Sequence, residues 1–443
     1  MEDDQVDLAD RLPDRPRSKH YVSILKQNSR ADPQSQPPNN LFVPVTPPDQ
    51  IVLQSPNVQP PPPNQYPSPA HSVPLAQQQA FSLLSPAAAP QVQYAPQREE
   101  GMRVIIYSAM PYEIEAFESQ LKTVPGADHI EIIPVPSSLD ITTASLALGA
   151  RAVCLFATDF ADIHMLHALR ACGVQMLVFR YSGATYFNEE QAFALGLRIA
   201  RPPTHAPSSV AEYTVSLLMT LNRKIHIAHN RVKDGNFSLH GLMGFELAGK
   251  TVGVVGTGRV GTAVARILSG FGCKILAFDV TEADEVLNAG GRYVSLKKLL
   301  ASSDVVTLHA PLMPATRHLI GSKTISTCKK GVVIVNTARG ALIDVRAAIE
   351  GLRSGQIGGL AMDVYEGETS MFFRDKTGEV VDMDLQVLKA MPNVLITGHQ
   401  SALTKEAIWA VAKTTIKCLK QFEMGLEMDY EVKPDAMGGR DGG

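Results

Sequence analysis

The stretch GVVGTGRVGTAVARIL, residues 253–268, decides the fold. It combines an apolar strand, glycines at Gly256, Gly258 and Gly261, and the periodic pattern of a helix. Glycine at these places permits a tight turn, close approach of the backbone to a pyrophosphate and close packing of helix on strand, while the helix amino terminus favours an anion. Because the three glycines lie between a strand and a helix, the motif predicts a dinucleotide site.

An acidic residue closes the next predicted strand. Asp279 ends KILAFD, 21 residues after Gly258. A carboxylate there can accept hydrogen bonds from the ribose hydroxyls of adenosine, and it would repel a 2′-phosphate. This pattern predicts NAD rather than NADP as the cofactor. The alternative is that Asp279 only caps the turn that follows the strand.

Working outward, short β-branched runs alternate with helical patterns from Met102 onward, which is typical of doubly wound parallel sheets. The runs around the glycine motif predict one unit, and an earlier set predicts a second unit of the same type. A helix is expected at 208–235 between the units, and another at about 405–425 that packs back onto the first. Further helices are expected after Tyr112, at 141–149 and at 164–173. The predicted strands are 102–109, 129–135, 152–157 and 176–180, then 250–256, 273–279, 305–311, 332–338, 359–365 and 393–399.

Residues 1–100 have a different composition from the rest. They hold 19 of the 30 prolines and none of the 33 glycines. A folded α/β domain needs glycine at turns and caps, so this proline- and glutamine-rich stretch is predicted to be a disordered extension. The net charge of −3 and the pI near 6.5 give no bulk electrostatic reason to bind nucleic acid or an anionic membrane.

The cysteines exclude two classes of site. All five are scattered, without a CxxC pair or a partnering histidine cluster, so neither a disulfide framework nor a metal site is predicted. No uninterrupted apolar run reaches the length of a membrane span. The acidic amino terminus lacks the apolar core of a secretory signal, and a cytoplasmic location is therefore expected.

Three candidate catalytic side chains follow three predicted strands. Arg339 lies in VNTARGALID, Glu368 closes DVYEGE and His399 lies in ITGHQ. Taken singly, the arginine could cap a helix or pair with Asp344, the glutamate could be merely solvated, and the histidine could be structural. Together, at the sheet edge where ligands gather, they can hold a carboxylate, keep an imidazole charged and transfer a proton. The trio predicts reduction of a 2-keto acid by a nicotinamide hydride.

From about Met102 to about Gly425, the chain resembles the D-isomer-specific 2-hydroxyacid dehydrogenases, most closely the NAD-dependent D-lactate dehydrogenases. The runs SVAEYTVSLLMTLNRKIH, LHAPLMPATRHLI, VNTARGALID, AMDVYEGE and TGHQSALT carry the likeness together with the glycine motif. The resemblance implies that Arg339 anchors the substrate carboxylate, that Glu368 raises the pKa of the histidine, and that His399 donates the proton. It further implies that Arg259, Val260, Asp279, Ala310, Pro311, Thr316, Thr337, Ala338 and Asp363 line the NAD site.

The resemblance also implies the domain organisation. A flavodoxin-like substrate domain would comprise 101–205 and 400–430, and a Rossmann-type NAD-binding domain would comprise 206–399. A flexible tail would follow at 431–443. The family further implies a small-molecule 2-keto or 2-hydroxy acid as substrate and a homodimer formed through the cofactor domain, with the helix after Pro207 contributing to the contact.

Several positions depart from the family pattern. The segment Arg180 to Tyr186 keeps Gly183 but changes the polar residues after it, and His205 replaces a tyrosine. Ala402 stands where an aromatic residue commonly follows the catalytic histidine. Loss of that ring enlarges the pocket unless Phe160 or Phe187 fills the space, so we hypothesise a 2-keto acid bulkier than pyruvate.

A second class of function is compatible with the same scaffold. Some relatives of the family, the carboxyl-terminal-binding co-repressors, are regulators, and an NAD-sensing interaction protein could use the long extension to recruit partners. The persistence of Arg339, Glu368 and His399 favours the enzyme, because a protein that only binds has no chemical need for all three.

Overall fold

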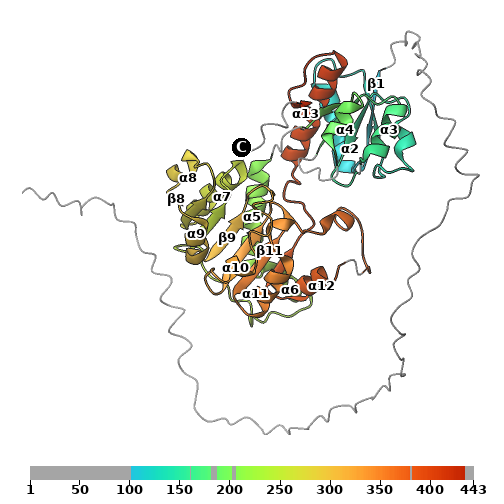
Figure 1. Ribbon diagram of the computed structural model, residues 1–443. Coiled ribbons are helices and arrows are strands. Elements are labelled where there is room, and N and C mark those ends of the chain that lie inside the picture. Colours follow the sequence, from blue (N-terminus) through green and yellow to red (C-terminus); the bar gives the residue numbers. More distant parts are fainter. Residues whose placement is uncertain (1–100, 160, 181–186, 202–205, 380–381, 435–443) are drawn as a thin grey trace, which may run out of the picture. The chain divides into compact units, whose positions relative to one another are not determined.

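A computed structural model describes residues 101–434 apart from 160, 181–186, 202–205 and 380–381 (Figure 1). The predicted disordered extension, residues 1–100, lies outside these residues, and so does most of the predicted tail at 431–443. The described residues all belong to one compact unit, Gln93–Gly443. Among them, no helix is both long and apolar enough to cross a bilayer.

The first sheet has six strands in the order β13-β5-β4-β3-β1-β2. All pairs are parallel except the one between β13 and β5. Neighbouring residues of a strand face opposite sides, and here both sides are buried: Val104 packs in one core and Ile105 in another. The strands are β1 Met102–Ile106, β2 Ile130–Pro134, β3 Ala152–Leu155, β4 Met176–Phe179, β5 Arg198–Ala200 and β13 Glu431–Val432.

Helices from both ends of the described chain cover this sheet. The carboxyl-terminal helix α13 (Lys405–Glu423), red in Figure 1, lies against α2 (Pro111–Thr123) and buries Ile416 and Leu419 in the core beside β1. Thr404 caps its amino terminus by accepting a hydrogen bond from the amide of Ala407. The expected return of this helix onto the first sheet is therefore observed. The opposite face carries η1 (Ala144–Ala147), α3 (Ile163–Ala171) and α4 (Glu189–Ala194).

The second sheet has seven parallel strands in the order β12-β11-β10-β9-β6-β7-β8. Its two faces also bury separate cores, because Val254 packs on one side and Val255 on the other. Successive strands are added to one side of β6 and then, from β9 onward, to its other side. The gap between β6 and β9 is therefore the topological switch point, where open α/β sheets bind ligands. The strands are β6 Thr251–Val255, β7 Lys274–Phe278, β8 Arg292–Tyr293, β9 Val305–Leu308, β10 Val332–Asn336, β11 Ile357–Met362 and β12 Val394–Ile396.

The helical elements of this part connect or cover its strands. Several are amphipathic and carry a side-chain cap; in α11, for example, Asp344 accepts a hydrogen bond from the amide of Ala347. The elements are α5 Pro207–Arg223, α6 Ile225–Lys233, α7 Arg259–Gly270, α8 Asp284–Asn288, α9 Leu296–Ser302, α10 Ser322–Ile325, η2 Gly340–Leu342, α11 Val345–Arg353, η3 Glu368–Ser370 and α12 Met383–Ala390.

The doubly wound fold class with two parallel sheets is confirmed, but three local expectations are wrong. The single helix expected at 208–235 is broken at Lys224, which has φ 50°, in the left-handed region. The helix expected at 141–149 is only the short 3₁₀ segment η1. The short strands β5, β8 and β13 were not predicted; each has two or three residues, too few for a periodic pattern.

Candidate active site

The glycine loop between β6 and α7 has the geometry of a nucleotide cradle. Gly256 has φ 91°, and a Cβ atom there would lie 2.5 Å from the backbone nitrogen of Ala310. A Cβ at Gly261 would lie 1.9 Å from the carbonyl oxygen of Gly256, so helix and loop pack too closely for any side chain. Gly258 caps α7, and a Cβ there would meet no atom within 4 Å. The loop therefore leaves open space at the helix amino terminus, as a bound pyrophosphate requires.

Asp279 lies beside this loop, directly after β7. One of its oxygens accepts a hydrogen bond from the amide of Thr257, inside the glycine motif. The other accepts from the amide of Val280, 2.6 Å away, in the following turn. The carboxylate thus caps the turn and also faces the nucleotide loop.

His399 and Glu368 are in direct contact. Nδ1 of His399 lies 2.7 Å from Oε1 of Glu368, and their side chains are only 12% and 19% exposed. The second oxygen, Oε2, accepts a hydrogen bond from the amide of Tyr365 at 2.8 Å, which fixes the carboxylate against β11. A carboxylate held this way orients the imidazole and fixes which ring nitrogen faces the cavity.

Arg339 follows β10 at the same edge of the sheet. Its backbone is shaped by Asn336, whose side chain donates to the carbonyl of Arg339 at 2.9 Å and accepts from the amide of Ala338 at 3.0 Å. The guanidinium donates to the carbonyl of Ala338 at 2.7 Å, and the described residues supply no carboxylate to pair with it. Asp344 is occupied in capping α11. The cation is thus available for an anionic ligand.

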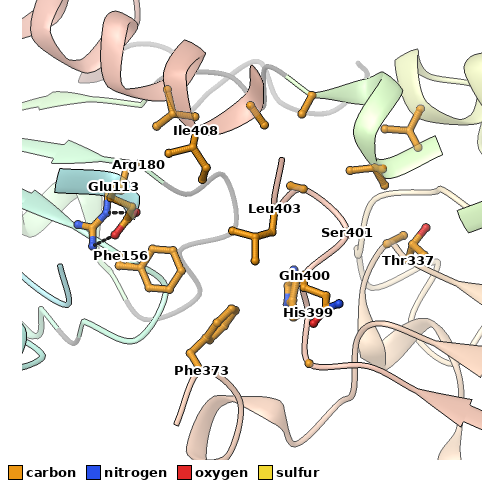
Figure 2. A pocket seen from close by; sticks show the side chains of 18 of the residues that line it. Glu113, Phe156, Arg180, Thr337, Phe373, His399, Gln400, Ser401, Leu403 and Ile408 are labelled. Carbon is orange, nitrogen blue, oxygen red and sulfur yellow. Dashed lines mark hydrogen bonds and ion pairs between the residues drawn. The ribbon is translucent and has the colours of Figure 1, made fainter. Parts of the chain in front are cut away.

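Arg339 and His399 line one cavity of about 510 Å³. Figure 2 shows His399 and Thr337 at this cavity. Residues of α5 and α7 and those after β9, β10, η3 and β12 line it from the second sheet's part of the chain. Residues after β3 and β4 of the first sheet line it as well, together with those of α2 and α13. Of the residues predicted for the NAD site, five line this cavity: Val260, Ala310, Pro311, Thr337 and Ala338. Glu368 supports the cavity from behind His399.

Besides the three glycines and Asp279, three further predicted cofactor residues do not line the cavity. Arg259 is the first residue of α7, next to the cap at Gly258. The hydroxyl of Thr316 donates to the carbonyl of Pro311 at 2.6 Å and so holds the loop after β9. Asp363 is fully buried and contacts the histidine loop.

The contacts of Asp363 bracket His399. Its oxygen Oδ1 accepts from the hydroxyl of Thr397 at 2.6 Å and from the amide of Gln400 at 3.0 Å, and Oδ2 accepts from the amide of Ser401 at 2.7 Å. His399 itself has φ 58°, a conformation that a non-glycine residue rarely adopts. The buried carboxylate therefore holds the strained turn that presents the imidazole.

Some residues of the site were not predicted. His309 lines the cavity beneath the glycine loop; burial lowers its pKa to about 3, and no described residue bonds to its Nε2. Arg180 and Glu113, which also line the cavity, form a buried ion pair at 2.8 Å, and Phe156 and Phe373 add two rings. His309 could have been predicted, because it lies in LHAP at the end of a predicted strand. No local sequence pattern indicates a role for Phe373.

Only some of the positions that depart from the family pattern belong to the described residues. Residues 181–186, which include Gly183, lie outside the described residues, as do Phe160 and His205. Phe187 packs on Phe179 in the core of the first sheet, 4.8 Å between ring centroids. It therefore does not fill the space beside Ala402, which lines the cavity.

The residues present fit a dinucleotide. A glycine loop with open space, a helix amino terminus and an acidic side chain at the neighbouring strand end form a cradle. The buried ring nitrogen of His309, which no described residue pairs with, lies next to it. A histidine held by a carboxylate shares a cavity with an arginine that no carboxylate of the described residues pairs with. Fold and site together define a nicotinamide-dependent oxidoreductase.

Comparison with known proteins gives the family. The family model for the D-isomer specific 2-hydroxyacid dehydrogenase, NAD binding domain, matches residues 215–401. D-lactate dehydrogenase kk1H of Curvularia clavata is 43% identical over 326 residues, which is 73% of this chain and 93% of that protein. The chain belongs to the D-isomer-specific 2-hydroxyacid dehydrogenase family, close to the D-lactate dehydrogenases, and is an NAD-dependent enzyme of that class.

Solved structures support the same assignment. The pyruvate reductase of Chlamydomonas reinhardtii superposes with a TM-score of 0.71 at 39% identity, covering 74% of this chain and 98% of that one. The NAD-complexed D-isomer specific 2-hydroxyacid dehydrogenase of Lactobacillus delbrueckii ssp. bulgaricus gives 0.64 at 30% identity, covering 75% and 100%. These relatives do not favour the alternative of an NAD-sensing regulator.

Proposed function

We propose that the protein reduces a 2-keto acid, pyruvate or a bulkier analogue, to the D-2-hydroxy acid and catalyses the reverse oxidation. The observation that supports this proposal is the 2.7 Å contact between His399 and Glu368 beside a cavity that Arg339 also lines. Bound NADH supplies the hydride for the carbonyl carbon C2.

His399 is the proposed proton donor in reduction and the acceptor in oxidation. Because Nδ1 faces Glu368, proton transfer to the keto oxygen uses the other ring nitrogen. The carboxylate of Glu368 orients the ring, so that this nitrogen is directed toward the substrate. The turn held by Asp363 limits rotation of the ring, and this restriction favours catalysis through orientation.

Arg339 is the proposed carboxylate anchor. A guanidinium can bind a carboxylate with two parallel hydrogen bonds, which fixes the plane of the keto acid as well as its position. With the carboxylate held at Arg339 and the keto oxygen at His399, one face of C2 is presented to the nicotinamide. This arrangement accounts for a single stereochemical product.

The NAD site is proposed to comprise Gly256, Gly258, Gly261 and the residues predicted with them. Asp279 would accept hydrogen bonds from the ribose hydroxyls, which gives preference to NADH over NADPH. Arg259, Val260, Ala310, Pro311, Thr316, Thr337, Ala338 and Asp363 complete the proposed set.

We also propose the predicted domain boundaries, with 206–399 as the cofactor domain, and a homodimer in a reducing compartment such as the cytosol. The segment after α6 supports the dimer, because Phe237, Leu239 and Met243 are 74%, 82% and 91% exposed. A loop with three such apolar side chains is typical of a subunit contact. All five cysteines, which lie in the described part of the chain, are free thiols.

The test is NADH oxidation by the purified protein with pyruvate, 2-ketoisocaproate and phenylpyruvate, followed by absorbance. We expect turnover with at least one acid and a preference for NADH over NADPH. His399→Ala should lower kcat by a factor on the order of 10³ while leaving the Kd for NADH unchanged. Silence with every acid despite tight NADH binding would favour the NAD-sensing alternative, and a strict pyruvate preference would reject the bulkier substrate.

A further inference from the structure

An aromatic ring lies against the imidazole of His399. The ring centroid of Phe373 is 5.6 Å from that of His399, with 39° between the ring planes. Phe373 comes from the segment after η3, and Figure 2 shows its ring at the cavity beside His399. The contact joins two segments that are separated by α12 and β12, so the local sequence around either residue does not predict it.

Both residues of this contact have a strained backbone. Phe373 has φ 63° and His399 has φ 58°, and they are two of only five non-glycine residues with positive φ in the described chain. Left-handed backbone at a bulky side chain persists where surrounding contacts over-determine it, and such positions cluster at functional sites.

Phe373 is supported from the other side by Phe156, which follows β3. Their rings meet edge to face, 5.1 Å apart at 78°. The guanidinium of Arg180 lies 5.1 Å from the centroid of the Phe156 ring. Arg180, whose side chain is 0% exposed, is held by Glu113; burial opposes its charge, but the Glu113 carboxylate raises the pKa of Arg180 above its ordinary value. A fixed cation therefore sets the position of Phe156.

The geometry of a 2-keto acid defines what Phe373 can touch. With its carboxylate at Arg339 and its keto oxygen at His399, the remaining substituent on C2 points away from both groups. The cavity wall next to the imidazole is the ring of Phe373, and Ala402 leaves space nearby. A methyl substituent leaves this space unfilled, whereas an aromatic substituent can pack on the ring edge to face or offset.

We propose that Phe373 is a specificity-determining residue that contacts the side chain of the substrate and favours 2-keto acids with an aromatic or large apolar substituent. This inference rests on the proposed dehydrogenase function. Phe156 acts as the backing of this wall and Arg180 as its support.

The experiment compares kcat/KM for phenylpyruvate with kcat/KM for pyruvate, using NADH. In Phe373→Ala the ratio should fall about tenfold, because the aromatic contact is lost while the methyl of pyruvate does not reach the ring. Phe373→Leu should lower the ratio as well, and it retains enough apolar volume to guard against a folding defect. Phe373→Tyr keeps the ring and should leave the ratio within about twofold of the wild type.

Phe372 provides the matched control. Its ring packs on the core of the second sheet rather than lining the cavity. Phe372→Ala should lower Tm without changing the ratio. An unchanged or increased ratio in both Phe373→Ala and Phe373→Leu would overturn the assignment of Phe373. A wild-type protein that turns over none of the acids, 2-ketoisocaproate included, would refute the proposed function and this inference together, whereas an active wild type with unaltered variants refutes only the inference.

Discussion

At the scale of single residues, the site depends on side chains whose charge state is set by burial. His309 is the clearest case, because its Nε2 is shielded from water and has no partner among the described residues. Burial lowers its pKa to about 3. The imidazole therefore stays neutral at physiological pH and can offer a neutral nitrogen to a bound cofactor.

Protonation of His309 should destabilise the protein in acid. The unfolded chain binds this proton near pH 6.5, but the folded chain does so only near pH 3. The stability associated with the neutral ring is therefore complete above pH 6.5 and decreases as pH falls, by up to about 1.4 kcal/mol per unit.

Tm of the cofactor-free protein, measured between pH 7.5 and pH 5, checks this expectation. His309→Gln cannot take up the proton, so its Tm should fall less steeply than that of the wild type. The other histidines are common to both proteins and serve as the internal control. Parallel profiles would contradict the buried neutral state.

At the scale of elements, the turn from β6 to α7 contains glycines with two different roles, one in the packing of the protein and one in leaving space for a ligand. Gly261 is required by the packing of the protein itself, since a Cβ would lie 1.9 Å from the carbonyl oxygen of Gly256. A Cβ at Gly258 would have no neighbour within 4 Å, so the protein itself leaves room for a side chain there. Only a bound ligand would exclude one.

The two glycines should respond differently to substitution by alanine. Gly261→Ala forces backbone apart and should lower the Tm of the cofactor-free protein, consistent with a cost of about 1–3 kcal/mol for overpacking. Gly258→Ala should leave that Tm unchanged and weaken NADH binding by about tenfold or more, because the methyl group enters the pyrophosphate space. Calorimetry for Tm and fluorescence titration for Kd separate the effects. Equal losses of Tm would contradict the distinction between Gly258 and Gly261.

At the scale of the whole molecule, the described residues contain two sheets whose strand ends supply the same cavity. Residues from both sheets therefore line the cavity in which a keto acid would bind. Arg339 and His399 follow strands of the second sheet, and Phe156 follows a strand of the first. The exposed segment after α6 lies in the cofactor part, and Asn222 holds it through two hydrogen bonds to the backbone of Phe245.

The proposed dimer can be tested through that segment. The double variant Leu239→Glu, Met243→Glu places charges on two of its most exposed apolar residues and should convert a dimer into a chain of 47.9 kDa, measured by light scattering. Ile141→Glu, at a residue 71% exposed elsewhere, should leave the mass unchanged. A monomeric wild type would refute the proposal.

Much of the fold was predictable because its signals are local. Alternation of buried β-branched runs with amphipathic helices predicts a doubly wound sheet, and the glycine motif predicts where a dinucleotide binds. The break at Lys224 and the pairing of β13 with β5 depend on contacts between distant residues, so helical and strand periodicity could not reveal them.

The sequence by itself determined the two-sheet class, the NAD motif and the residue types at three strand ends, since strand polarity brings such ends to one edge. Only the tertiary structure decided that Glu368 meets His399, that Asp363 holds the strained histidine turn, and that Phe373 lies on the imidazole. The physical reason is that these contacts arise from loops of irregular backbone. Their conformation is set by packing against distant segments rather than by any local periodicity.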